Sequence, residues 1–258
     1  MNKALAVVLT AGGRIVRQDF PNAVLEDGDS GYKCLLKVKG RTLLETVLEA
    51  VRGWGGADRV VVVGNPLLQR WLHAPNEVLV PERAEAHENL IAGLEAVARY
   101  PRVLYLTTDL PFVTAEAIAH FVASCPPDAQ VCYAVVRREA FEARFPGSPS
   151  SYARLRDGEF AGGCAAMVEP GVLLARKEWI RRVAERRKSL WRLALIAGAS
   201  MLWKYATRRL TVADVERRAE YLLGARCRAV ECDAVLAYDI DTPQEYLYAL
   251  RVADDRAG

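Results

Sequence analysis

The sequence predicts an α/β protein with a mixed, mostly parallel sheet that helices cover on both faces. Short, continuous apolar runs recur along the chain, and such runs are typical of strands buried on both faces. Between them lie segments with the apolar periodicity of helices, at the spacing of strand–helix–strand units. The chain has 258 residues, of which 52% are hydrophobic and 26% are charged, so it is long enough to bury a substantial core.

The first half of the chain alternates strands and helices. Residues 4–9 form an apolar strand that ends in Thr-Ala-Gly-Gly, and glycine and proline keep residues 12–31 irregular. Thr42 and Glu45 form a capping-box pair, which predicts a helix with an inward stripe of leucine and valine. Further strands are predicted at 59–63, 77–80, 102–107 and 130–136, and further helices at 86–100 and 114–124.

The second half of the chain contains more helix than strand. Residues 139–163 are rich in loop-forming residues, and residues 164–168 follow as a short strand. Residues 178–223 predict three helices, the last of which begins with the cap pair Thr211 and Asp214. We expect this segment to form a helical insertion in the C-terminal half.

The end of the chain returns to the sheet. Apolar residues give strand character to residues 228–232 and 235–240. Thr242, Pro243 and Glu245 then combine an N-cap, a proline at the first helical position and a capping-box acid. This pattern predicts a C-terminal helix.

The composition is that of a cytoplasmic globular protein. The formal net charge of +3 does not indicate a nucleic-acid partner. The six cysteines form no CxxC pair, and there are only three histidines, so we expect buried, reduced thiols rather than a zinc site or a disulfide framework. The sequence predicts neither a signal peptide nor a transmembrane helix.

Small residues follow the first predicted strand, where residues 9–14 read Leu-Thr-Ala-Gly-Gly-Arg. Small side chains allow backbone N–H groups to approach phosphate oxygens, and Arg14 with the later Lys33 would neutralise a triphosphate. The pattern is neither a Walker loop nor a GxGxxG fingerprint, and a strand that ends in Gly-Gly is often only a turn. These residues alone leave both interpretations open.

Acidic residues follow two of the apolar runs. Asp109 comes after the strand at 102–107, where it would either bind Mg²⁺ or cap a turn. Asp239 and Asp241 precede the last helix, and Asp241 would alternatively stabilise the positive helix terminus. A metal site requires Asp109 to converge with one of these two. Ligands bind outside the carboxyl ends of the strands in such sheets, so one rim is expected to hold residues 10–14 and 107–111.

Four segments occur together in an order and spacing that resembles the MobA-like NTP transferases. They are LTAGGR (9–14), YKCLLKVKGRTLLETVLEAV (32–51), TTDLPF (107–112) and YDIDTPQEY (238–246). This family includes molybdenum cofactor guanylyltransferase and cytidylyltransferase and shares its fold with sugar-phosphate nucleotidylyltransferases. The resemblance implies a Rossmann-like fold of the GT-A type and a single domain over residues 1–258. Its expected parts are a nucleotide-binding half (1–136), an acceptor side with the helical insertion (137–236) and a returning metal-binding segment (237–258).

The resemblance also implies an activity: Mg²⁺-dependent transfer of NMP from an NTP to a phosphorylated or hydroxyl acceptor, with release of pyrophosphate. The expected partners are therefore an NTP and a small anionic acceptor, and no nucleic acid. By position, the resemblance assigns the nucleotide to Leu9, Thr10, Ala11, Gly12, Gly13 and Asn89, catalysis to Arg14, Lys33 and Asp109, metal binding to Asp109, Asp239 and Asp241, and the acceptor to Gly162 and Gly163.

Two features depart from the family pattern. The relatives place the arginine and lysine of the loop a few residues apart, whereas eighteen residues, several of them acidic, separate Arg14 from Lys33 here. The longer loop is either a mobile lid or a loop that has lost its usual grip on phosphate, and Arg17 is an alternative to Arg14. Cys164 stands where relatives often have asparagine near the acceptor.

A basic segment lies in the helical insertion. Between residues 176 and 209 there are eleven lysines and arginines and only two acids. These residues are consistent with helices that have a solvated basic face, or with an anionic acceptor site in which Arg187 and Lys188 hold a phosphate. A third interpretation is an amphipathic surface over residues 186–209, including Trp203, that contacts anionic lipid at a membrane.

Two other functions fit the same predicted fold. A glycosyltransferase that uses a nucleotide-sugar would more often have an Asp-x-Asp motif after a mid-chain strand, and Thr107-Thr108-Asp109 lacks the first acid. A nucleotide-binding protein without turnover is favoured by the long acidic loop. Release of pyrophosphate from an NTP distinguishes the transferase from both.

Overall fold

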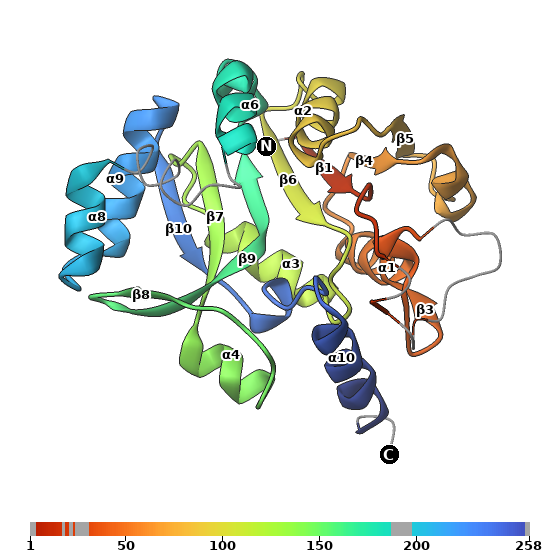
Figure 1. Cartoon of the computed structure of the whole chain (residues 1–258). Helices are drawn as coiled ribbons and strands as arrows, with labels where there is room; N and C mark the ends of the chain where they lie inside the picture. Colours follow the sequence, from red (N-terminus) through yellow and green to blue (C-terminus); the bar gives the residue numbers. More distant parts are fainter. Residues whose placement is uncertain (1–3, 17–18, 21–22, 24–30, 187–197, 256–258) are drawn as a thin grey trace.

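A mixed sheet of eight strands organises the computed structural model, which describes residues 4–16, 19–20, 23, 31–186 and 198–255 (Figure 1). The strand order is β10-β7-β9-β6-β1-β4-β5, and β8 pairs with β9 at one side of this path. The strands are β1 (Leu5–Thr10), β4 (Arg59–Gly64), β5 (Glu77–Pro81), β6 (Arg102–Thr107), β7 (Val131–Arg137), β8 (Ala153–Leu155), β9 (Gly158–Val168) and β10 (Cys227–Glu231).

Most neighbouring strands are parallel, as the sequence predicted. β1 pairs in parallel with β4 and β6, β4 with β5, and β10 with β7, whereas β9 is antiparallel to both β6 and β7. The central strand β1 is buried on both faces because Val7 and Leu9 belong to one hydrophobic core and Ala6 and Val8 belong to another. The predicted fold class is therefore confirmed.

Helices cover both faces of the sheet. α1 (Leu43–Trp54) and α3 (Ala115–Ser124) pack together on one face. α2 (Ala86–Ala96) packs on β1 and β4 from the other face, where Gly93 is required because a Cβ atom there would overlap the side chain of Val8. The other helices within the described residues are α4 (Arg138–Arg144), α5 (Pro170–Leu174), α6 (Lys177–Arg186), α8 (Ala199–Ala206), α9 (Val212–Leu223) and α10 (Pro243–Asp255), and the 3₁₀ turns there are η1 (Lys33–Leu35), η2 (Pro66–Trp71) and η3 (Ala234–Leu236).

The predicted helix starts are confirmed at the atomic level. Thr42 and Glu45 form a reciprocal capping box at the start of α1, and Thr211 with Asp214 does the same for α9. At the start of α10 the Glu245 carboxylate accepts a hydrogen bond from the Thr242 amide at 2.7 Å. These local interactions satisfy backbone groups that a helix terminus otherwise leaves without partners.

The prediction of loop over residues 139–163 is wrong. α4 and β8 lie in this stretch, and β9 begins at Gly158 rather than at residue 164. The small residues of β9 look like a loop in the sequence, but the structure uses them for close packing between β6 and β7. A Cβ atom on Gly163 would lie 2.6 Å from the Cβ of Ala134, so the pairing of the strands explains this glycine.

The prediction of a strand over residues 235–240 is also wrong. These residues begin with η3, whose first turn the Asp233 carboxylate caps by accepting a hydrogen bond from the Val235 amide at 3.0 Å. The apolar residues here are buried against the core without pairing in the sheet. Periodicity cannot separate such a run from a buried strand.

A short hairpin precedes α1 and was not predicted. β2 (Lys37–Val38) and β3 (Arg41–Thr42) are antiparallel, and the two residues between them, Lys39 and Gly40, both have positive φ. Positive φ at both central residues is the geometry of a tight hairpin turn, in which glycine is favoured. The hairpin leads directly into the capping residue of α1.

The described part of the segment that was predicted to hold three helices contains α6, α8 and α9. Residues 187–197, which include Arg187 and Lys188, lie outside the described residues. The boundaries predicted at residues 136 and 236 between functional parts of the chain stay predictions. Among the described residues, no helix combines the length and the apolar character needed to cross a bilayer.

We expect the Arg52–Glu77 ion pair to contribute strongly to stability. The Glu77 carboxylate is almost fully buried and accepts two hydrogen bonds from Arg52, at 2.7 and 2.8 Å, and two from the amides of His73 and Ala74. Glu77→Gln should lower the free energy of unfolding by about 3 kcal/mol in urea titrations, because it leaves Arg52 without its counter-charge. The control Glu49→Gln, in a solvent-exposed pair with Arg41, should cost less than about 0.5 kcal/mol.

The difference in the free energy of unfolding between wild type and Glu77→Gln should depend on pH. Burial would raise the pKa of Glu77, but the hydrogen bonds from Arg52, Ala74 and His73 outweigh burial and hold it below its usual value. The contribution of Glu77 is therefore present above the pKa of an unfolded glutamate, about 4.3, and is lost as the pH falls through the lower folded value. The gap between wild type and Glu77→Gln should narrow below about pH 4. A gap that stays constant down to about pH 2 would contradict this account.

Candidate active site

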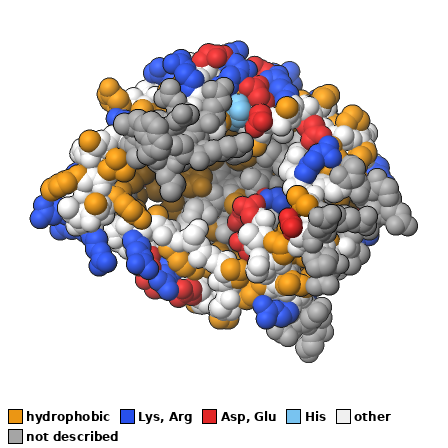
Figure 2. Space-filling model, viewed as in Figure 1, with side chains coloured by type: hydrophobic (Ala, Val, Ile, Leu, Met, Phe, Trp, Pro, Cys, Tyr) orange, Lys and Arg blue, Asp and Glu red, His pale blue; other side chains and the backbone are white. Residues whose placement is uncertain are grey.

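A cleft of about 220 Å³ opens at the carboxyl ends of β1 and β6. This is the rim at which ligands bind in open α/β sheets. Six of the predicted site residues line the cleft together: Thr10, Gly12, Gly13, Lys33, Asn89 and Asp109. In Figure 2 this face of the molecule is hollowed near its centre, and acidic side chains lie at the edge of the hollow.

The ends of two distant segments meet beside this cleft. The Ile240 amide donates a hydrogen bond to the Asp109 carbonyl at 3.1 Å, which brings the segment before α10 against the end of β6. As a result, ligand atoms of Asp109, Cys164 and Asp239 all lie within 4.8 Å of one another. Asp109 Oδ1 is buried and has no hydrogen-bond partner among the described residues. The convergence that a metal site requires therefore occurs for Asp239.

Lys33 lies between the carboxylates of this region. Its ammonium forms ion pairs with Asp109 and, at 2.5 Å, with Asp241, and its amide donates to the Gly13 carbonyl at 2.8 Å. Burial alone would lower the pKa of Lys33, but the two carboxylates outweigh burial and raise the pKa above its usual value. Lys33 is therefore positively charged at any physiological pH, as a phosphate ligand needs to be.

The carboxylates outnumber the cationic groups at this point. Burial, with the nearby charges of Asp109 and Asp241, raises the pKa of Asp239 to about 7. Lys33 is the one ammonium facing Asp109, Asp239 and Asp241 within the described part of the chain. A buried carboxylate with an unpartnered oxygen, Asp109, and a half-buried carboxylate, Asp239, are the kind of donors that a hard divalent cation takes, so the residues present fit Mg²⁺.

The loop after β1 divides into two parts. Leu9 is paired with both neighbouring strands, and the Ala11 amide donates to the Val63 carbonyl at 2.8 Å, so the sheet uses these positions. The amides of Gly12 and Gly13 have no acceptor among the described residues. The part of the loop that is available to a phosphate is therefore Gly12–Gly13.

Gly12 and Asn89 are in close contact. A Cβ atom on Gly12 would lie 2.6 Å from Asn89 Nδ2 and 2.8 Å from a carboxylate oxygen of Glu82. Asn89 is buried, and its Oδ1 accepts a hydrogen bond from the Arg83 amide at 2.6 Å, which fixes the orientation of its side chain. A side chain at position 12 would therefore displace Asn89 or Glu82 from the cleft wall.

Comparison with known proteins agrees with this geometry. A family model for the MobA-like NTP transferase domain matches residues 7–230. A hypothetical transferase from Thermus thermophilus is 34% identical, with a TM-score of 0.81 over 94% of this chain and 99% of that chain. The chain belongs to the MobA-like NTP transferase family. It is a nucleotidyltransferase, and the sequence-based recognition of the family is confirmed.

Two further solved structures share the fold at lower identity. One is 4-diphosphocytidyl-2C-methyl-D-erythritol synthase from Anaerococcus prevotii, at 13% identity and a TM-score of 0.62, covering 98% of this chain and 97% of that chain. The other is 2-C-methyl-D-erythritol 4-phosphate cytidylyltransferase from Thermus thermophilus, at 21% identity and a TM-score of 0.55, covering 97% of this chain and 99% of that chain. No curated protein matches the chain.

Arg14 of this MobA-like transferase is not among the residues that line the cleft. Its guanidinium lies 4.1 Å from the centre of the Tyr32 ring and 3.6 Å from a Glu82 carboxylate oxygen, and its side chain is half exposed. The Tyr32 hydroxyl donates to Glu82 at 2.5 Å and accepts from Asn65 at 2.8 Å. Sequence reasoning missed this network, because the partners of Tyr32 follow two other strands. Arg17, the alternative to Arg14, lies outside the described residues.

The two glycines predicted for the acceptor have different surroundings. Gly162 is exposed and lines a second cavity of about 280 Å³ together with Asp239 and Asp241. Gly163 is buried against Ala134, so its packing accounts for it without a ligand. Lys188 lies outside the described residues, and lipid contact through residues 186–209 stays a prediction. In the described part of that segment, α8 leaves three large side chains exposed: Leu202, Trp203 and Tyr205.

Several cleft residues of this family member were not assigned from the sequence. The Tyr105 hydroxyl and the Thr10 hydroxyl are 2.9 Å apart, and the Thr108 hydroxyl donates to the Thr10 carbonyl at 2.9 Å. The strand period of two could have found part of this set, because Tyr105 and Thr107 lie on the same face of β6 and both line the cleft. Cys164 joins the carboxylate cluster, and burial raises the pKa of its thiol above the usual range.

We expect Gly12→Ala to weaken NTP binding by about tenfold or more, because displacing Asn89 or Glu82 reshapes the cleft wall. The matched control is Gly13→Ala, whose added methyl would meet the nearest atom, in the Lys33 side chain, only at 3.4 Å. The NTP affinity of the two variants is measured calorimetrically in the absence of metal, so that metal binding at the carboxylates does not contribute to the difference. Equal affinity of Gly12→Ala and wild type would show that Gly12 does not shape the nucleotide site.

Proposed function

We propose that this protein transfers an NMP group from an NTP to a phosphorylated or hydroxyl acceptor in a Mg²⁺-dependent reaction that releases pyrophosphate. The observation that supports this proposal most directly is the convergence of Asp109 and Asp239 beside Lys33, at the mouth of the cleft that Gly12 and Gly13 line. This set combines donors for a divalent cation with a fixed positive charge and free backbone amides, which are the groups that a triphosphate requires.

Each residue has a role that follows from its place. The amides of Gly12 and Gly13 bind phosphate oxygens, and Asn89 orients the nucleoside against the cleft wall. Lys33 neutralises negative charge on the transferred group. Asp109 and Asp239 would hold Mg²⁺, which when bound offsets charge on the phosphate oxygens. Arg14 would approach the phosphates only by leaving Tyr32 and Glu82.

The transfer step needs no covalent intermediate with the protein. An oxygen of the acceptor forms a bond to the α-phosphorus, and the bond from that phosphorus to the oxygen bridging to the β-phosphate breaks. Pyrophosphate leaves with the electron pair of the broken bond, and the proton of a hydroxyl acceptor passes to solvent. Catalysis then depends on positioning and on charge stabilisation by Lys33 and the bound cation.

The same proposal includes a cytoplasmic location and a small anionic acceptor. All six cysteines are free thiols, which suits a reducing compartment. The acceptor side would lie in the cavity that Gly162, Asp239 and Asp241 line, which has no lining residue in common with the nucleotide cleft.

The test is pyrophosphate release. With Mg²⁺ and a small-molecule extract as the source of acceptor, one of the four NTPs should give pyrophosphate at a rate that Asp109→Ala lowers by about a hundredfold or more. Asp128→Ala, which removes an exposed carboxylate that pairs only with Arg226 among the described residues, should leave the rate unchanged. A thermal-shift series over ATP, CTP, GTP and UTP selects the base beforehand, because a bound ligand raises the melting temperature. Absence of pyrophosphate above the Asp109→Ala background with every NTP would refute the proposal.

Binding gives a second measurement of the role of Asp109. Asp109→Ala should weaken the affinity for Mg-NTP more than about tenfold, by analogy with the loss of groups around metal sites. The affinity for metal-free NTP should change much less, or increase, because the variant removes a negative charge. Identical Mg-NTP affinity in Asp109→Ala and wild type would remove Asp109 from the metal site.

A further inference from the structure

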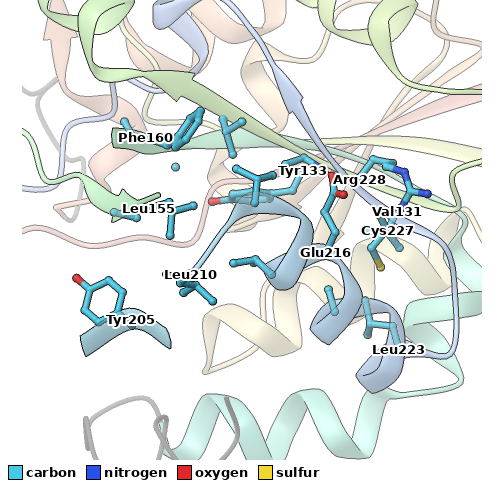
Figure 3. A pocket seen from close by; sticks show the side chains of 18 residues that line it. Val131, Tyr133, Leu155, Phe160, Tyr205, Leu210, Glu216, Leu223, Cys227 and Arg228 are labelled. Atoms are coloured by element: carbon cyan, nitrogen blue, oxygen red, sulfur yellow. Dashed lines mark hydrogen bonds between the residues drawn. The ribbon is translucent and has the colours of Figure 1, made fainter. Parts of the chain in front are cut away.

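An apolar pocket of about 370 Å³ lies beside the candidate acceptor side, between the sheet and α9 (Figure 3). β7 contributes Val131, Tyr133 and Val135 to its wall, and these residues share one face of the strand because side chains alternate along it. α9 closes the opposite wall with residues that include Val215 and Ala219. We call this cavity the β7–α9 pocket.

The wall of the β7–α9 pocket contains two charged residues, Glu216 and Arg228, and both side chains have hydrogen-bond partners within the protein. The Glu216 carboxylate accepts a hydrogen bond from the Ala229 amide at 2.9 Å. The Arg228 guanidinium donates to the Glu220 carboxylate and to the Cys227 carbonyl, both at 2.6 Å. A ligand in the pocket would therefore meet mainly carbon atoms.

The wall is open to solvent in the described structure. Tyr133 is 50% exposed, Tyr205 is 52% exposed and Val215 is 42% exposed, although all three face the same hollow. Figure 2 shows hydrophobic side chains on the α8 and α9 side of the face that holds the acidic edge of the cleft. Contiguous exposed apolar surface of this kind is typical of ligand and partner sites.

The size of the β7–α9 pocket favours a small molecule over a protein helix. Ligand pockets are commonly about 300–1,000 Å³, and this cavity lies in that range. A helix with its side chains is about 10–12 Å across, so even two turns would exceed the available volume.

The β7–α9 pocket shares part of its wall with the cavity on the acceptor side. Ala161 and Gly162 line both this pocket and the cavity that contains Asp239 and Asp241. Gly162 has no side chain to separate the two cavities, and a Cβ atom there would lie 3.0 Å from the Tyr133 hydroxyl. One molecule that crosses Gly162 would have a polar end near Asp239 and an apolar end against Tyr133 and Val215.

We propose that the β7–α9 pocket binds the hydrocarbon part of an amphiphilic acceptor whose phosphate or hydroxyl head reaches Asp239 across Gly162. This inference rests on the proposed transferase function, to which it adds the chemical class of the acceptor. The apolar wall recognises chain length rather than a hydrogen-bonding pattern, because burial of each methylene contributes independently of direction.

A series of alkyl phosphates tests the proposal. Butyl, hexyl, octyl and decyl phosphate are titrated calorimetrically into the protein in the presence of Mg²⁺ and below their micelle concentrations, with inorganic phosphate as the reference. Affinity should rise about threefold to fourfold for each methylene that enters the pocket. Equal affinity for inorganic phosphate and decyl phosphate would overturn the proposal.

Pocket-filling variants locate the binding. Ala219→Phe on α9 and Ala229→Phe on β10 each place a ring in the pocket and should abolish the dependence on chain length. Ala213→Phe, on an exposed position of the same helix, is the matched control and should preserve the dependence. Melting curves identify any variant that does not fold. If one of the two pocket variants does not fold, the other still tests the proposal. Retention of the chain-length dependence in a folded pocket variant would overturn the assignment to this cavity.

The experiment separates this inference from the proposed function. Mg-NTP affinity is measured in the same proteins, and Ala219→Phe should leave it unchanged because the β7–α9 pocket and the nucleotide cleft have no lining residue in common. Normal Mg-NTP binding and pyrophosphate release without chain-length dependence would refute only the amphiphilic acceptor. Chain-length dependence without Mg-NTP binding would refute the transferase function and leave a hydrocarbon site.

Discussion

The hydrogen bond from the Ile240 amide to the Asp109 carbonyl is the contact on which the candidate site depends. It joins the end of β6 to the segment between η3 and α10, which is more than a hundred residues later in the chain. Aromatic packing supports this junction: the Tyr238 ring lies 4.7 Å from that of Phe145 and 5.2 Å from that of Phe112, between centroids. Such pairs contribute about 0.5–1.5 kcal/mol each beyond the burial of their area. The fold thus fixes Asp239 beside Asp109 through contacts that involve neither carboxylate.

These contacts hold the carboxylates of Asp109 and Asp239 close together, although the repulsion between the two is unfavourable for folding. Asp109 is buried and Asp239 is half-buried beside Cys164, and burial, with the charges of Asp109 and Asp241, raises the pKa of Asp239 because the charged form is unfavourable there. The ion pair between Arg52 and Glu77 shows the contrast, because there every oxygen of the buried carboxylate has donors. A buried oxygen without a partner, as in Asp109, is the expected mark of a site that is shaped for a ligand rather than for stability.

Local chemistry decided which features the sequence could predict. Two helix starts could be predicted because each depends on a pair of residues only three positions apart, which a short stretch of sequence shows in full. The pairs are Thr42 with Glu45 and Thr211 with Asp214. The start of β9 was predicted wrongly because Gly163 is a glycine on account of its close contact with Ala134, which lies on another strand. The rule that parallel strand ends share a rim brings Thr10 and Asp109 to one cleft, as the sequence predicted, whereas Lys33 and Asn89 reach the same cleft from η1 and α2. The partners of Arg14, and the position of Asp239 rather than Asp241 beside Asp109, depend on side-chain packing between separate segments.

The position of Lys33 links the two halves of the site. While its ammonium is paired with both Asp109 and Asp241, it cannot offer its full charge to a phosphate. In the proposed function, a divalent cation held by Asp109 would remove one partner of the ammonium and leave it available to the nucleotide. Binding of cation and binding of nucleotide would then be coupled through one lysine, and such coupling is reciprocal by thermodynamic necessity. Asp241, which is mostly exposed, pairs with the same ammonium, so in the proposed function it would position the lysine rather than bind the metal.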